Sequence, residues 1–349
     1  MEIVVRAVTY FADSRQDFRE EYWNGLRILD EASEIIRELG FNVFTKRISM
    51  YKLSRSDILK LPSLASRDVL VSAGYINPRS LHVDDFKYLT NSGVYTPILP
   101  RLDDFTRDEA VNFSRIIHSV AEENPVNATR VSIGFHSESF MTPYFPDSSS
   151  RGFKSIGLAF LYTEALKAGS LNSISAHIER VFKEFEVIAS SLEVKLGLPV
   201  FIDYSLSPWM EMSVAGLLES LGFKVTEPGF NYALYTVNKL IAEYSNHSRA
   251  IGFNEVMLPY AEDSVLVEYG GSGLLKARDF LRYASTCVAG VDMIIVPSNI
   301  EKLAGLIMDS YSLSMVKSRP LSLRVIPVNK EPGEKVELGK FGESFVIGY

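Results

Sequence analysis

The sequence contains a single cysteine, Cys287, among 349 residues. One cysteine excludes an intramolecular disulfide, a CxxC redox pair and a cysteine-rich zinc site, and it cannot hold an iron–sulfur cluster by itself. We therefore expect a reducing, cytoplasmic location. By composition alone, a cysteine just before a buried strand is most often a small core residue.

Long apolar runs and an excess of positive charge are also missing. No run approaches the ~20 apolar residues of a membrane-spanning helix, and Glu2 and Arg6 interrupt any signal-peptide core. With 36 Lys and Arg against 43 Asp and Glu, the net charge is -7. This balance gives no general attraction to nucleic acid or to an anionic membrane, so we expect neither as a partner.

Metal and nucleotide signatures are absent as well. The five histidines are scattered without an HExxH pattern, so we expect no metal site. Neither GxxxxGK[ST] nor a GxGxxG after a strand occurs. The sequence therefore leaves any cofactor unknown.

The pattern that does stand out is an alternation of short β-branched runs with longer helical periods, which is typical of an α/β protein. We expect helices at 16–39, 106–122, 175–196, 210–221, 231–247, 273–285 and 299–316. We expect ten strands, at 3–9, 41–49, 68–72, 94–99, 130–135, 153–162, 198–203, 223–226, 291–297 and 321–328. Such a chain fits either one large barrel or two open sheets, and no linker divides it.

Polar residues follow several of these strands, where α/β proteins bind ligands. His136 and Glu138 follow one strand and have the chemistry of an acid and a base, although a structural hydrogen-bonding role is the alternative. Asp203 and Ser205 follow another strand; they suit a ligand hydroxyl or a metal, or Asp203 caps the next helix.

Two neighbouring cations, Lys46 and Arg47, lie within the second expected strand. Side chains alternate between the faces of a strand, so at most one of the two can face the interior. We take Lys46 as a candidate for positioning an anion.

Three segments together resemble the domain of unknown function 711 family of uncharacterised archaeal and bacterial proteins. Residues 202–208 resemble a family segment of the form hydrophobic-Asp-x-Ser-Leu-Ala-Pro. Residues 287–297 resemble Cys-x-x-Gly-x-Asp-Met followed by an apolar strand and Pro, and residues 324–327 resemble Arg-Ile-Ile-Pro. The likeness extends over roughly residues 5–345, and the chain departs from bacterial relatives in lacking their Gly-rich run at 157–164.

The resemblance implies a single domain over 1–349, with a barrel of about ten strands similar to the pyruvate formate-lyase-like fold. It also implies that the segment bearing Cys287 lies inside this barrel. It also draws attention to Asp292 and Arg324, which lie in the matching motifs. The C-terminal residues 341–349 lack a radical-glycine motif and no Cys-Cys pair occurs, so radical chemistry is not expected.

We expect a cytosolic small-molecule enzyme that performs acid–base chemistry on a small anionic metabolite. In this hypothesis Cys287, Asp203, His136 and Glu138 are catalytic, and Ser205, Lys46, Arg324 and Asp292 bind the substrate. The alternative is a metabolite-binding or regulatory protein that has kept an enzyme-like barrel without its chemistry. A homo-oligomer fits either hypothesis.

Overall fold

A computed structural model describes residues 3–64, 66, 68–167, 170–171, 173–286 and 289–349. Eleven strands are assigned in these ranges: β1 Val4–Phe11, β2 Val43–Ser49, β3 Val69–Ser72, β4 Val94–Ile98, β5 Val131–Phe135, β6 Ser155–Leu161, β7 Val200–Asp203, β8 Gly290–Pro297, β9 Leu321–Val328, β10 Lys335–Glu337 and β11 Glu343–Phe345.

Nine of the strands form one mixed sheet in the order β7-β6-β1-β2-β3-β4-β5-β9-β8. Strands β1 to β5 run parallel to one another. Strand β6 is antiparallel to β1, and β9 is antiparallel to β5. The outer pairs β6–β7 and β8–β9 are again parallel. Two antiparallel seams therefore separate three parallel blocks.

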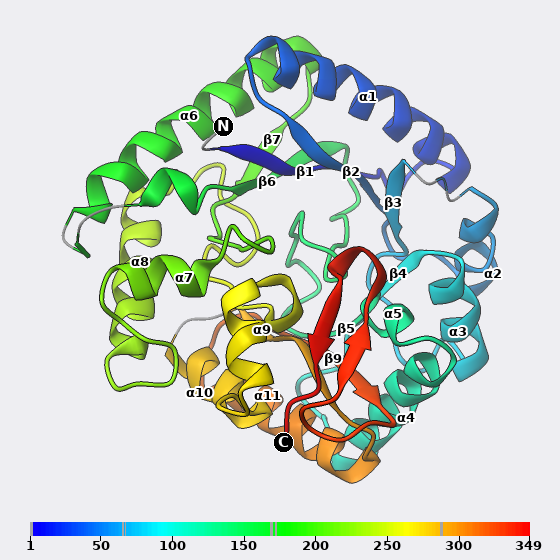
Figure 1. Ribbon diagram of the computed structural model, residues 1–349. Coiled ribbons are helices and arrows are strands. Elements are labelled where there is room, and N and C mark those ends of the chain that lie inside the picture. Colours follow the sequence, from blue (N-terminus) through cyan, green and yellow to red (C-terminus); the bar gives the residue numbers. More distant parts are fainter. Residues whose placement is uncertain (1–2, 65, 67, 168–169, 172, 287–288) are drawn as a thin grey trace.

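Helices lie around the outside of the strands, while several loops occupy the inside (Figure 1). The α-helices are α1 Phe18–Glu38, α2 Arg55–Ile58, α3 Val83–Asn91, α4 Arg107–Glu123, α5 Pro125–Ala128, α6 Ile174–Leu196, α7 Val214–Ser220, α8 Phe230–Tyr244, α9 Ser264–Gly271, α10 Ala277–Thr286 and α11 Ile300–Lys317. Short 3₁₀ helices are η1 Leu61–Ser63, η2 Glu164–Leu166, η3 Tyr260–Glu262 and η4 Gly339–Phe341. None of the helices in the described ranges is long and apolar enough to cross a membrane.

The longest helices show how the sequence produces this outer layer. The Asp17 carboxylate accepts hydrogen bonds from the Arg19 and Glu20 amides and so caps the start of α1. The apolar stripe of α6 is buried, and the helix ends at Gly197, whose φ of 65° is the left-handed conformation that glycine adopts without strain. The main hydrophobic core lies between these helices and the sheet.

The α/β class and nine of the ten expected strands are confirmed, but the strand expected at 223–226 is wrong. The amide of Phe223 donates back to the Leu218 carbonyl oxygen and closes α7, and the Glu227 amide then bonds to Lys224 in a turn. The expectation also missed α3 and α9, and α7 and α10 begin four residues later than expected.

An irregular segment, 249–257, lies beside β7 and the residues that follow it. The Ile251 amide donates to the Ile202 carbonyl at 2.9 Å, and the Met257 amide donates to the Leu206 carbonyl at 2.8 Å. Over the described ranges, no ladder of hydrogen bonds joins the edge strands β7 and β8. The observed architecture is therefore a nine-stranded sheet with outer helices.

The long connection between β5 and β6, residues 136–154, runs through the inside of the molecule. The Ser150 hydroxyl donates to the Ala12 carbonyl at 2.6 Å, and the Ser72 hydroxyl donates to the Ser148 carbonyl at 2.7 Å. These bonds fix the connection, which we call the interior loop, to the ends of β1 and β3.

Candidate functional site

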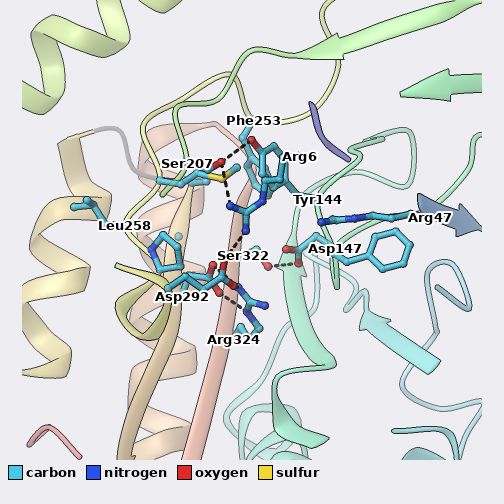
Figure 2. Close-up of a pocket in the computed structure, with 16 residues that line it drawn as sticks. Arg6, Arg47, Tyr144, Asp147, Ser207, Phe253, Leu258, Asp292, Ser322 and Arg324 are labelled. Atoms are coloured by element: carbon cyan, nitrogen blue, oxygen red, sulfur yellow. Dashed lines mark hydrogen bonds and ion pairs between the residues drawn. The ribbon is translucent and has the colours of Figure 1, made fainter. Parts of the chain in front are cut away.

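A cavity of about 40 Å³ lies inside the sheet, against the interior loop (Figure 2). A volume of that size holds about three water molecules. Its lining is unusually rich in charge for a protein interior: Arg6 from β1, Arg47 from β2, Arg324 from β9, Asp292 from β8, Glu262 from η3 and Asp147 from the interior loop. We call these six residues the central cluster.

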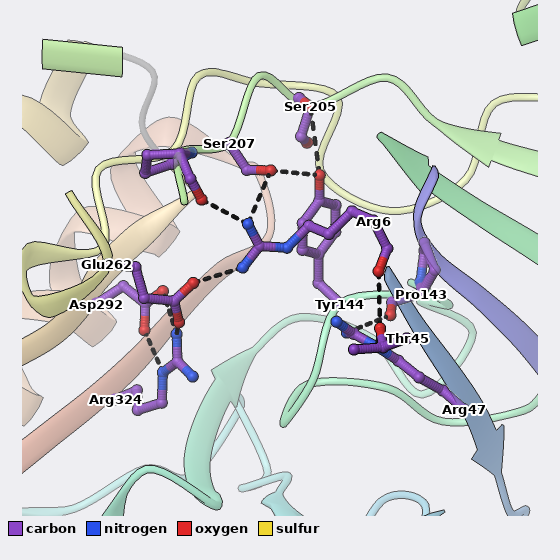
Figure 3. Close-up of polar contacts among 11 residues, drawn as sticks. Arg6, Thr45, Arg47, Pro143, Tyr144, Ser205, Ser207, Glu262, Asp292 and Arg324 are labelled. Carbon is purple, nitrogen blue, oxygen red and sulfur yellow. Dashed lines mark hydrogen bonds and ion pairs between the residues drawn. The ribbon is translucent and has the colours of Figure 1, made fainter. Parts of the chain in front are cut away.

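Four members of the central cluster form a chain of alternating charges (Figure 3). Glu262 accepts from Arg6 on one side and, at 2.9 Å, from Arg324 on the other. Arg324 also makes a bidentate contact with Asp292, with distances of 2.6 Å from Nε and 2.8 Å from Nη2. Bidentate geometry is the strongest arrangement of this pair, and it fixes both side chains.

The protonation equilibria reflect these contacts. Burial would by itself raise the pKa of Glu262, but the neighbouring Arg6 and Arg324 outweigh it and hold the pKa below its usual value. Burial likewise favours the neutral form of Arg324, yet Asp292 and Glu262 raise its pKa. These groups are therefore charged at neutral pH.

Arg47 is the exception, because it is buried without a carboxylate partner in the described part of the chain. Its Nη1 donates to the Pro143 carbonyl at 3.0 Å, and its Nε donates to the Thr45 hydroxyl at 2.9 Å. The guanidinium lies 5.2 Å from the centre of the Phe145 ring. Burial, together with the charge of Arg6, lowers its pKa from 12.5 to about 10. A fixed, uncompensated cation thus lines the cavity.

Two β-bulges place central-cluster residues. The pairing of β1 with β6 steps from Val5 to Ala7 while β6 advances by one residue, so Arg6 is the extra residue. The pairing of β8 with β9 shifts between Asp292 and Ile294, where Met293 has a φ of 55°. Bulges re-aim side chains and are common beside active sites.

The interior loop supplies the remaining polar groups. The Tyr144 hydroxyl lies 3.1 Å from the Ser207 hydroxyl, and its ring lies against the Arg6 guanidinium. Asp147 accepts a hydrogen bond from the Ser322 hydroxyl. Burial raises the pKa of Asp147 to about 6, despite that bond. Asp147 can therefore exchange a proton near neutral pH.

Of the residues predicted from sequence, Asp292 and Arg324 lie together in the cavity. Lys46 does not reach it. Its ammonium lies 2.7 Å from Asp30 of α1, on the outer face of β2, and the neighbouring Arg47 takes the interior position. The alternation of side chains along β2 explains this exchange.

His136 and Glu138 line a different and larger cleft, of about 540 Å³, at the ends of β3, β4 and β5. They do not contact each other: Glu138 pairs with Lys52 at the surface, whereas His136 is buried between the rings of Tyr75 and Phe140. Burial lowers the pKa of His136 to about 4, so the imidazole is neutral at pH 7.

Asp203 is buried outside the cavity and joins three segments. Its carboxylate accepts from the Ser205 and Thr142 hydroxyls at 2.6 and 2.9 Å, and from the amides of Ser205, Phe253 and Asn254. Burial raises its pKa even so. Asp203 and Ser205 therefore hold the interior loop and segment 249–257 against the end of β7.

Cys287 lies outside the described residues. Ala289 and Gly290, which come shortly after it in the chain, line the cavity.

Sequence reasoning missed Arg6, Tyr144, Asp147 and Glu262 as members of one site. An arginine within an apolar strand was a signal for Arg6, but the bulge that turns it inward has no sequence pattern that we recognise. The described residues include no cluster of three or more His, Cys, Asp or Glu side chains suited to a metal ion.

The fold and the central cluster define an α/β protein whose curved sheet encloses a charged cavity. The family described as "Uncharacterised ACR (DUF711)" matches residues 157–339, more than half of the chain, so the protein belongs to that family. Glu262, Asp292 and Arg324 lie within the matched range, whereas Arg6, Arg47 and Asp147 precede it.

Similar curated proteins carry the name UPF0210. One from Methanopyrus kandleri is 27% identical over 201 residues, which cover 54% of this chain and 44% of that protein. One from Lactiplantibacillus plantarum is 25% identical over 263 residues, which cover 69% of this chain and 59% of the relative. The chain spans about half the length of the curated relatives it matches.

Proposed function

We propose that this protein is a small-molecule enzyme that binds a small anion in the central cavity and moves a proton to or from it. The observation that carries the proposal is the convergence of three buried arginines on one cavity, one of them without a carboxylate partner in the described chain. An unpaired buried charge costs several kcal/mol of folding free energy, which is reasonable where a ligand supplies the counter-charge.

Asp147 is the proton-transfer group in this proposal. Its pKa of about 6 is close to physiological pH, where an acid or base works best, and its carboxyl group lines the cavity with Arg47 and Arg324. In the proposed reaction Arg47 holds the anion while Arg324 and Asp292 shape the opposite wall. The Tyr144 hydroxyl, bonded to Ser207, orients the ligand.

Two further parts of the proposal come from the family resemblance. Cys287 remains a candidate catalytic residue, supported by the position of Ala289 and Gly290 in the cavity wall. We also propose that the sheet closes into a barrel similar to the pyruvate formate-lyase-like fold, with segment 249–257 as the tenth member. The pairing of this segment with β7 supports that arrangement.

The test is a panel of small anionic metabolites, screened first by thermal shift and then by mass spectrometry for product. We expect Asp147→Asn to bind ligand but lose turnover, and Arg47→Met to lose both. Cys287→Ser should lose turnover if the thiol takes part. The proposal fails if no anion raises the melting temperature, or if Asp147→Asn and Arg47→Met both turn over as the wild type does.

A binding protein without catalysis is the second candidate. Both Asp292 oxygens bond to Arg324, and Glu262 pairs with two arginines. Asp147 is therefore the one carboxylate of the central cluster without an ion pair in the described chain, so few groups are left for acid–base chemistry. Binding across the panel without any product would support this candidate over the enzyme.

A further inference from the structure

The central cavity differs from a general anion site in three measurable respects: its net charge, the donors it presents and its size. Each respect restricts the ligand, and this inference rests on the proposed function of anion binding.

The charge balance restricts the ligand to a single negative charge. The positive charges of Arg6 and Arg324 are compensated by Glu262 and Asp292 through direct contacts. Of the three arginines in the central cluster, Arg47 is the one without a carboxylate partner in the described chain. A dianion, such as a phosphate monoester, would bring an excess of negative charge into a buried site, and an unpaired buried charge is costly.

The state of Asp147 completes this balance. The charged and titratable groups that face it are Arg324 from β9, Asp292 from β8 and Tyr75 from the loop after β3, and Arg47 from β2 lines the same cavity. The Ser322 hydroxyl donates a hydrogen bond to it. An anion held beside Asp147 raises the pKa of this carboxyl further, because like charges disfavour ionisation. A monoanion and a neutral Asp147 therefore leave the cavity electrically balanced.

The donors of Arg47 fit a carboxylate. Its Nε and one Nη1 hydrogen are used by Thr45 and Pro143, and Nη2 has no hydrogen-bond partner among the residues that the structure describes. One Nη1 hydrogen and both Nη2 hydrogens thus remain as donors in the plane of the guanidinium. Two donors in a plane match the two oxygens of a carboxylate.

The size and the apolar wall of the cavity restrict the rest of the ligand. The cavity of about 40 Å³ accommodates about three water-sized groups, and its wall also includes Phe253, Met257 and Leu258. These side chains offer no counter-charge to a second acidic group. We infer that the central cavity binds a monocarboxylate of one or two carbons, with its carboxylate on Arg47 and its methyl group, where it has one, against the apolar part of the wall.

The experiment is isothermal titration calorimetry on the full chain at pH 6 with formate, acetate, butyrate, benzoate, acetamide and inorganic phosphate. We expect formate and acetate to bind, with butyrate, benzoate, acetamide and phosphate each weaker by about tenfold or more. Arg47→Met should weaken acetate binding roughly 10- to 100-fold, from the strength of hydrogen bonds to charged groups.

Lys46→Met is the matched control, because it removes a cation from the adjacent residue on the opposite face of β2. We expect its affinity to stay within about twofold of wild type. Circular dichroism checks that each variant is folded, and Arg47→Gln replaces Arg47→Met if the latter does not fold. Arg47→Lys should bind more tightly than Arg47→Met but less tightly than wild type, because lysine restores the charge without the planar pair of donors.

Tighter binding of phosphate than of acetate, lost in Arg47→Met, would overturn the monocarboxylate inference and leave anion binding at this site standing. Equal affinities in Arg47→Met and Lys46→Met would overturn both, as would the failure of every anion to bind.

Discussion

Arg47 and Arg324 are both buried arginines of the same cavity, yet their replacement by methionine should have very different effects on stability. The difference arises from their partners. Arg324 compensates Asp292 and Glu262, whereas Arg47 has carbonyl and hydroxyl acceptors and no carboxylate in the described chain. Methionine removes the charge while retaining much of the side-chain volume.

The magnitude for Arg47 can be worked from its pKa. A fall from 12.5 to about 10 corresponds to roughly 3 kcal/mol by which the folded state disfavours the charged form. Against this, Arg47→Met removes the hydrogen bonds from the charged guanidinium to Pro143 and Thr45, each worth about 1.5 kcal/mol. The two effects nearly cancel, so we expect the free energy of unfolding to stay within about 1 kcal/mol of wild type.

Arg324→Met removes the bidentate partner of Asp292, whose side chain is 32% exposed, and leaves the buried Glu262 with Arg6 alone. Removing one member of a buried ion pair typically costs about 3–5 kcal/mol. Urea denaturation at pH 7, followed by circular dichroism, measures both variants against wild type. A loss in Arg47→Met as large as that in Arg324→Met would refute the idea that Arg47 is an uncompensated charge held for a ligand.

Three further predictions concern buried groups. Folding raises the pKa of Asp147 to about 6, so the contribution of this carboxyl to the free energy of unfolding falls as pH rises from about 4 to 6. Asp147→Asn should therefore be more stable than wild type at pH 7, by up to about 3 kcal/mol. Urea titrations should show that this advantage disappears near pH 4. Burial lowers the pKa of His136 to about 4, so the free energy of unfolding of the wild type falls by up to about 3 kcal/mol as pH falls from 6.5 to 4. His136→Phe should remove that loss. If the variant's stability depends on pH as the wild type's does, His136 is not buried and neutral. In Gly252→Ala the new Cβ would lie 2.0 Å from Asp203 Oδ2. Gly197→Ala is the control, because this glycine also has a positive φ but a Cβ there meets nothing within 4 Å. The melting temperature should fall clearly more in Gly252→Ala, and equal falls would argue against the packing around Asp203.

Much of the fold could be predicted because the strands and long helices carry local signals. The repeat of apolar residues in α6 and the glycine that ends it are sufficient to place that helix. The failure at 223–226 has a local cause: after Gly222 the chain bonds back to α7, and β-branched or aromatic residues alone do not reveal that turn. Segment 249–257, which pairs with β7, has no regular alternation to identify it.

The site was less predictable, since it depends on contacts between distant segments. The sequence pointed to polar residues at the ends of strands, but Asp203 bonds to Ser205, Glu138 pairs with Lys52, and neither lines the cavity. Asp292 and Arg324 came from the family resemblance, not from a chemical pattern. Arg6 reaches the cavity through a bulge and Asp147 through a loop, and neither device can be inferred from the spacing of residues.

The interior loop has a consequence for how the chemistry of such a site can change over time. The arginines are anchored on β1, β2 and β9, where a substitution disturbs the sheet, whereas Tyr144 and Asp147 belong to a connection that is not part of any strand. Loops accept substitutions and changes in length more readily than strands do. Under the proposed function, a change at Tyr144 or Asp147 that keeps Pro143 and Phe145 against Arg47 would alter the chemistry and leave the three arginines in place, so two proteins with the same arginines need not share a product.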